Sequence, residues 1–147
     1  MSYDILPAKG QIIDKTFVFP VRIYYEDTDA GGIVYYANYL KFAERARTEF
    51  LRALNVNQQD NLEENKTGFV VRSCHAEYLS SAFLDDALVV TCKVTELGGA
   101  YVVMKQEICR GNNVLTSIEI KAVYMSILTH RPTRIPAELS AKIKELM

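Results

Sequence analysis

The residues best suited to chemistry lie together at positions 24–39, which read YYEDTDAGGIVYYANY. Two carboxylates, Asp27 and Asp29, are followed by the glycine pair Gly31 and Gly32. A carboxylate can act as a nucleophile or as a general base toward water. Glycine lets the backbone approach a ligand without side-chain obstruction, which makes Gly32 a candidate substrate-binding residue.

A helix is expected directly after this stretch. Apolar residues recur at helical spacing, with charged residues between them, which predicts one long helix over residues 39–54: Tyr39, Phe42, Ala43, Ala46, Phe50, Leu51 and Leu54. A helix N-terminus presents free N–H groups and a partial positive charge, both of which stabilise an oxyanion. The combination suits acyl transfer to water. Asp and Gly are also ordinary capping and turn residues, and Asp27 in particular is expected to cap or brace the loop.

The helix needs a sheet to cover its apolar stripe. Alternating or β-branched segments predict strands over residues 17–25, 69–79, 87–97 and 114–128, with one more strand between the turns at 98–99 and 111–113. A short helix is expected over 137–146, after Pro136. The predicted fold is α+β: an antiparallel sheet of about five strands wrapped around one long central helix. We expect residues 1–16 to be an N-terminal lead-in and 17–147 to be a single domain.

Composition excludes several classes of protein. The chain has 147 residues, with 17 Lys+Arg against 18 Asp+Glu, which excludes a broadly basic nucleic-acid-binding surface. The longest apolar runs have five residues, far short of the ~18 that suggest a membrane span. No signal-peptide pattern opens the chain, and the three cysteines have no metal-ligand spacing. We therefore expect a cytoplasmic protein with reduced, core-filling cysteines and no metal site.

The segments 25–39 and 42–49 strongly resemble the hotdog-fold acyl-CoA thioesterases. The nearest resemblance is to the YbgC-type, Tol–Pal-associated thioesterases within the 4-hydroxybenzoyl-CoA thioesterase group. It is carried by the specific motif Asp-x-Asp-x-x-Gly-x-Val-Tyr, which begins at Asp27, and extends from about residue 17 to 136. The resemblance implies a hotdog fold that hydrolyses a small or medium acyl-CoA, or an acyl-carrier-protein thioester. It implies no cofactor.

The resemblance also implies roles for single residues. Asp29 matches the family's catalytic carboxylate, which attacks the thioester carbonyl or activates water. Tyr36 matches the position whose backbone N–H binds the thioester oxygen; a histidine often stands there in YbgC-type members. Glu44 aligns with a position that faces the acyl pocket, although it also reads as an exposed helix carboxylate near Arg47 or Arg45.

A basic cluster follows the last predicted strand. It consists of His130, Arg131 and Arg134, and arginine suits bidentate phosphate contact. The resembling family commonly meets the CoA phosphates with basic groups at subunit surfaces, so we assign these residues to substrate binding; the alternative is a solvated loop.

A second copy of the chain is the expected partner. The sheet has an outer face with four apolar residues, Val89, Val123, Met125 and Ile127, which predicts cover by another copy. The resemblance to this family implies a homodimer or homotetramer with active sites at the dimer interface.

Two other classes of function stay open from the sequence. A non-catalytic module would bind acyl-CoA or an acyl carrier protein without turnover, and an envelope-associated interaction protein would do neither. Dehydration of hydroxyacyl thioesters is disfavoured, because it relies on a histidine and neither His75 nor His130 lies in the motif.

Overall fold

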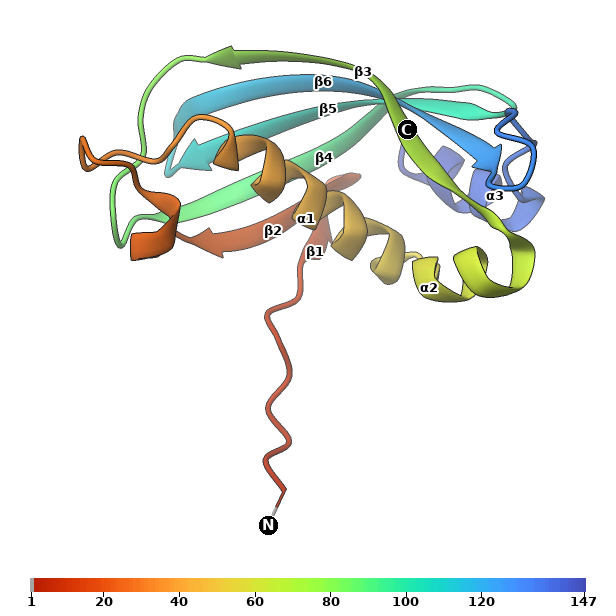
Figure 1. The fold of residues 1–147 in the computed structure, drawn as a ribbon, viewed down its shortest axis with the longest axis horizontal. Helices are drawn as coiled ribbons and strands as arrows, with labels where there is room; N and C mark the ends of the chain where they lie inside the picture. The colour runs from red at the N-terminus through yellow and green to blue at the C-terminus, as the bar shows by residue number, and fades with distance from the viewer. Residues whose placement is uncertain (1) are drawn as a thin grey trace.

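The computed structural model describes residues 2–147 (Figure 1). A first group of elements precedes the long strands: β1 (Gln11–Ile13), β2 (Thr16–Arg22), a 3-10 turn η1 (Tyr25–Asp27), α1 (Asn38–Ala53), α2 (Gln58–Asp60) and η2 (Asn61–Asn65). The second group is β3 (Thr67–Tyr78), β4 (Ala87–Leu97), β5 (Tyr101–Arg110), β6 (Asn113–Ser126) and α3 (Ala137–Glu145).

The strands form one antiparallel sheet in the order β1-β2-β4-β5-β6-β3. Figure 1 shows this sheet curving around α1, which packs against β2, β4 and β5. The predicted α+β architecture, a sheet wrapped around one long helix, is therefore confirmed. None of the helices in residues 2–147 has the length and apolarity needed to cross a membrane.

β1 is a sixth strand, which the sequence did not predict because its segment was expected to be lead-in. All three of its residues are exposed, so no alternation of apolar and polar residues marks it. Asp14 and Lys15, with φ of 48° and 64°, both lie in the left-handed region, as in the two-residue turns that join hairpin strands. This turn pairs Gln11–Ile13 with β2.

The core lies between α1 and the concave face of the sheet. The helix buries the predicted stripe, including Tyr39, Phe42, Ala43, Ala46 and Phe50, and Phe50 packs on Phe17 of β2 with ring centroids 5.4 Å apart. α3 adds Leu139 and Ile143 to the same core. Lys142 of α3 donates from Nζ to the Leu54 carbonyl, 2.9 Å away, and so satisfies a free carbonyl at the C-terminal end of α1.

The cysteines are only partly the core fillers that were expected. Cys92 is buried, and burial raises the pKa of its thiol to about 12. Cys109 is half-buried, whereas Cys74 of β3 is exposed, because β3 is an outer strand whose residues are largely uncovered.

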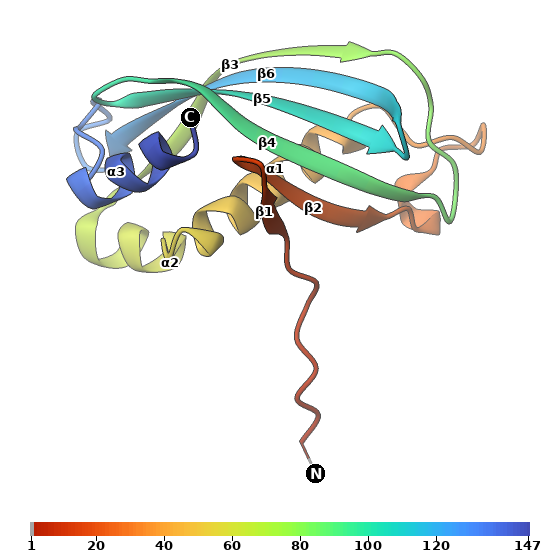
Figure 2. The same ribbon diagram turned by 180° about the vertical axis from the view of Figure 1, so that it is seen from behind.

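The outer face of the sheet also needs less cover than expected. Val123 is buried and Met125 half-buried within the single chain, while Val89 and Ile127 are exposed. Figure 2 shows β3 running along one border of the sheet. The part of the sheet that is left uncovered is therefore mainly the free edge of β3, and less of the outer face of the sheet than expected.

Candidate active site

Asp29 lies at the start of a tight turn formed by residues 28–34. Thr28 pairs with Val34, the Asp29 N–H donates to the Ile33 carbonyl at 2.8 Å, and the Gly32 N–H donates to the Asp29 carbonyl at 3.1 Å. The Asp29 side chain is exposed, and its Oδ1 accepts the Gly31 N–H at 2.8 Å. The turn thus orients the carboxylate while leaving it open to a ligand.

Asp27 braces this segment, as predicted. Its Oδ2 accepts the Tyr24 N–H at 2.8 Å. Its carbonyl accepts the Tyr35 N–H at 3.0 Å and the side-chain amide of Asn38 at 2.9 Å. Asp27 therefore ties the turn to the first residue of α1.

The start of α1 supplies free donors. The N–H groups of Asn38, Tyr39 and Leu40 donate to the carbonyls of Tyr35, Tyr36 and Ala37. Within residues 2–147, the N–H groups of Tyr36 and Ala37 have no hydrogen-bond acceptor. They lie at the positive end of the helix, where an oxyanion is stabilised. The Tyr36 ring is more than half exposed and meets the Tyr78 ring edge-on, with centroids 5.5 Å apart.

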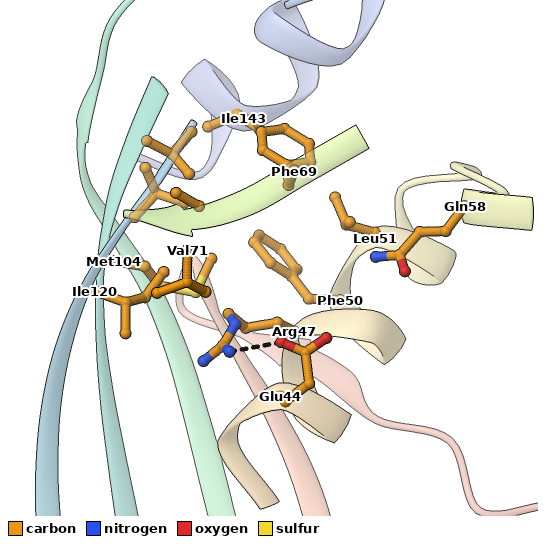
Figure 3. A pocket seen from close by; sticks show the side chains of 13 residues that line it. Glu44, Arg47, Phe50, Leu51, Gln58, Phe69, Val71, Met104, Ile120 and Ile143 are labelled. Carbon is orange, nitrogen blue, oxygen red and sulfur yellow. Dashed lines mark hydrogen bonds and ion pairs between the residues drawn. The ribbon is translucent and has the colours of Figure 1, made fainter. Parts of the chain in front are cut away.

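Glu44 borders a small apolar cavity of about 90 Å³ (Figure 3). Its lining joins α1 to the concave face of the sheet and includes Phe50, Leu51, Phe69, Val71, Met104 and Ile120. Glu44 accepts a hydrogen bond from Arg47 at 2.5 Å and keeps 57% of its side chain exposed. Glu44 is therefore an exposed partner of Arg47, as one sequence interpretation expected, and it also borders an apolar cavity; its role toward an acyl group stays a prediction.

Gln106 is a residue beside this pocket that sequence reasoning missed. It is fully buried, accepts from Arg47 Nη1 at 2.7 Å and donates to the Ala43 carbonyl at 3.0 Å. The sequence did contain a sign of its role: Gln106 is a polar residue at an inward-facing position of β5, between the buried Met104 and Ile108. Gln106 thus ties Arg47, and through it Glu44, to β5.

The basic cluster lies far from Asp29 within one chain. His130, Arg131 and Arg134 are exposed, and the loop that carries them reaches the turn after β4, where the Ile135 N–H donates to the Gly99 carbonyl. The Asp29 turn lies near the other end of β4, an 11-residue strand that spans roughly 33 Å. Figure 1 likewise shows the start of α1 and the end of β6 at opposite ends of the molecule. The structure therefore does not bring the basic cluster and Asp29 together in one copy.

Residues 23–143 match the family model of the thioesterase-like superfamily. The acyl-CoA thioesterase YbgC of Haemophilus influenzae is 44% identical to the chain over 135 residues, which cover 92% of this chain and 99% of that protein. The chain belongs to the YbgC-type acyl-CoA thioesterases.

Two further relatives agree with this membership. The acyl-CoA thioesterase YbgC of Helicobacter pylori is 40% identical, over 86% of this chain and 96% of that protein. The crystal structure of a probable thioesterase from Bartonella henselae has a TM-score of 0.78 at 31% identity, covering 82% of this chain and 99% of the other. The YbgC-type family and its fold therefore extend over most of the chain.

Gly32 has a conformation that explains its place in this YbgC-type turn. Its φ is +82°, and a Cβ placed on its Cα would meet no atom within 4 Å. Gly32→Ala should therefore cost about 1 kcal/mol of folding stability through backbone conformation alone, measured by urea unfolding. Gly99→Ala is the matched control, because Gly99 has equal space and no positive φ. Equal stability of the two variants would contradict the expectation.

Proposed function

We propose that the chain hydrolyses acyl-CoA thioesters through the Asp29 carboxylate and the free N–H groups of Tyr36 and Ala37. The observation that carries this is an exposed, hydrogen-bonded carboxylate in the turn directly before a helix start with two unused donors, in a member of an acyl-CoA thioesterase family.

The chemistry has two routes. As a general base, Asp29 takes a proton from water while the oxygen attacks the thioester carbonyl. As a nucleophile, it forms an anhydride with the acyl group that water then cleaves. In both, the tetrahedral oxyanion accepts hydrogen bonds from the N–H groups at the helix start, the carbon–sulfur bond breaks, and the CoA thiolate leaves and takes up a proton. The products are the free acid and CoA.

The acyl group is proposed to be small or medium in size. The cavity beside Glu44 is about 90 Å³, small against the roughly 300–1,000 Å³ of pockets for drug-sized ligands. Glu44, at the cavity, and Gly32, in the Asp29 turn, are the proposed substrate-binding residues. The acyl donor is CoA or an acyl carrier protein. A cytoplasmic location is proposed as well, supported by three free cysteines and a CoA substrate.

A second copy is proposed to pair along the free edge of β3, as a dimer or within a tetramer. β3 is 12 residues long and carries exposed Val70 and Val71, and such an edge favours pairing with another strand. Two-fold symmetry sets the start of the partner's β3 beside Tyr78 of this chain. Because Thr67 pairs with Ser126, the partner's basic loop then approaches Tyr36, which contacts Tyr78.

Release of CoA thiol from a panel of acyl-CoAs tests the proposed reaction. The panel is acetyl-, butyryl-, octanoyl-, palmitoyl- and benzoyl-CoA, with octanoyl-acyl carrier protein as a further donor. We expect turnover with a maximum among the short and medium chains. Calorimetric binding without thiol release would identify a binding module instead, and neither binding nor release would contradict the proposal entirely.

A further inference from the structure

Residues 81–86, here called the bracket loop, lie against the active-site turn and are fixed by an ion pair. Arg110, the last residue of β5, contacts Asp86 Oδ2 at 2.7 Å and donates to the Ser81 carbonyl at 3.2 Å. Asp86 Oδ2 also accepts the Phe83 N–H at 2.9 Å. The Phe83 N–H, together with Arg110, holds the pKa of the Asp86 carboxyl below its ordinary value. Arg110 thus joins both ends of the loop, Ser81 and Asp86, to β5.

The bracket loop holds the turn that carries Asp29. The Ala82 carbonyl accepts the Val34 N–H at 2.9 Å, and Phe83 forms an antiparallel bridge with Ile33. The Ile33 carbonyl in turn accepts the Asp29 N–H at 2.8 Å. Asp29 is therefore connected to the bracket loop through one residue.

The same loop holds the start of α1. The Ala82 N–H donates to the hydroxyl of Tyr39 at 2.9 Å. Tyr39 is 3% exposed and lies three residues after Tyr36. One backbone unit at Ala82 therefore contacts both halves of the site, with its N–H on the helix and its carbonyl on the turn.

We propose that the Asp86–Arg110 pair is a positioning element for the reaction: by fixing the bracket loop, it sets the Asp29 carboxylate relative to the Tyr36 N–H. The inference rests on the proposed function of those two groups. Catalytic groups must be held within about 0.5 Å of their productive geometry, and a displacement of about 1 Å can lower the rate a hundredfold. Asp86 and Arg110 need not touch substrate to have this effect.

A purely structural pair predicts a different result. Partly exposed ion pairs contribute little to stability, and the Asp86 and Arg110 side chains are 22% and 35% exposed. Removal of such a pair would lower Tm and leave kcat unchanged. A positioning pair instead changes kcat at constant KM, because the substrate still binds.

Steady-state kinetics with the best acyl-CoA of the panel separate these cases. We expect Arg110→Met and Asp86→Asn each to lower kcat about 10- to 100-fold, with KM within about twofold, and Arg110→Lys to recover part of the loss. Asp86→Asn keeps an acceptor for the Phe83 N–H, so it carries the test if Arg110→Met does not fold. Arg52→Met is the control, because it breaks an ion pair with Glu49 on α1 outside the site. Wild-type kcat in the folded variants would overturn the proposal.

A double-mutant cycle shows whether the pair acts through Asp29. Arg110→Met reduces kcat by some factor in the wild-type background. In the Asp29→Asn background, we expect that factor to be at least about fivefold smaller. Equal losses in both backgrounds would overturn the proposal. If Asp29→Asn alone keeps the wild-type rate, the proposed catalytic role of Asp29 fails. This result is distinct from a failure of the proposed positioning role of the Asp86–Arg110 pair.

Discussion

Asp29→Asn is expected to lower kcat for acyl-CoA hydrolysis by about two to four orders of magnitude. Asparagine retains the Oδ1 acceptor for the Gly31 N–H, so the turn keeps its shape. The amide can neither take a proton from water nor attack the thioester, whereas substrate contacts are unchanged. KM should therefore stay within about threefold, as measured by thiol release under steady-state conditions.

Glu26→Gln is the matched control for this variant, because Glu26 is an exposed carboxylate in the same segment and no role is assigned to it. A wild-type kcat for Asp29→Asn, with an unchanged Tm, would refute the role of Asp29. Repeated turnover in heavy-oxygen water then separates the two routes. Label in the Asp29 carboxylate, detectable by peptide mass spectrometry, identifies a nucleophilic Asp29 whose anhydride is attacked by water at the aspartyl carbonyl, whereas a general base incorporates no label.

Two impaired variants are expected to restore activity when they share a dimer. One carries Asp29→Asn, and the other carries Arg131→Gln with Arg134→Gln, which should raise KM for acyl-CoA at least about tenfold through lost phosphate contacts. In a mixed dimer, an intact Asp29 faces an intact basic cluster at one of the two sites. Random mixing of equal amounts therefore gives about one quarter of the wild-type sites, measured at subsaturating substrate after co-refolding.

The same experiment contains its controls. Each parent refolded alone should stay at its own low activity, and sedimentation should find dimers or larger assemblies throughout. A mixture with only the mean activity of its parents would show that the basic cluster does not serve the partner's site. A monomer at micromolar concentration would remove the basis for a shared site altogether.

The periodicity of apolar residues predicted those helices and strands that bury one face in the core. The stripe from Tyr39 to Phe50 indicated the central helix, and strand alternation indicated the sheet. β1 was not predicted because its three residues are all exposed. It pairs with β2 because of the turn at Asp14 and Lys15, which both have positive φ. Such a strand has no burial pattern from which to be predicted.

The candidate site could be read from the sequence only where its residues are contiguous. Asp29, Gly32 and Tyr36 lie within eight positions of one another, so one segment revealed them. Asp86 and Arg110 are 24 residues apart, and nothing local marks them as a pair until β4 and β5 fold together. The basic cluster was visible as a cluster, but it lies far from Asp29 within one copy, and the proposed approach of the two involves a second copy, which one sequence cannot contain.

The contact between Lys142 and the Leu54 carbonyl joins residues 88 positions apart, and this separation has a consequence for synthesis. Within residues 2–147, β3 hydrogen-bonds in the sheet only to β6, which is synthesised later than β3, β4 and β5. Until β6 and α3 have emerged, β3 has no strand to pair with, and the C-terminal end of α1 lacks both its cap and the apolar cover from Ile143. Contacts of such long range slow folding, so the core of the nascent chain closes only after β6 and α3 have emerged.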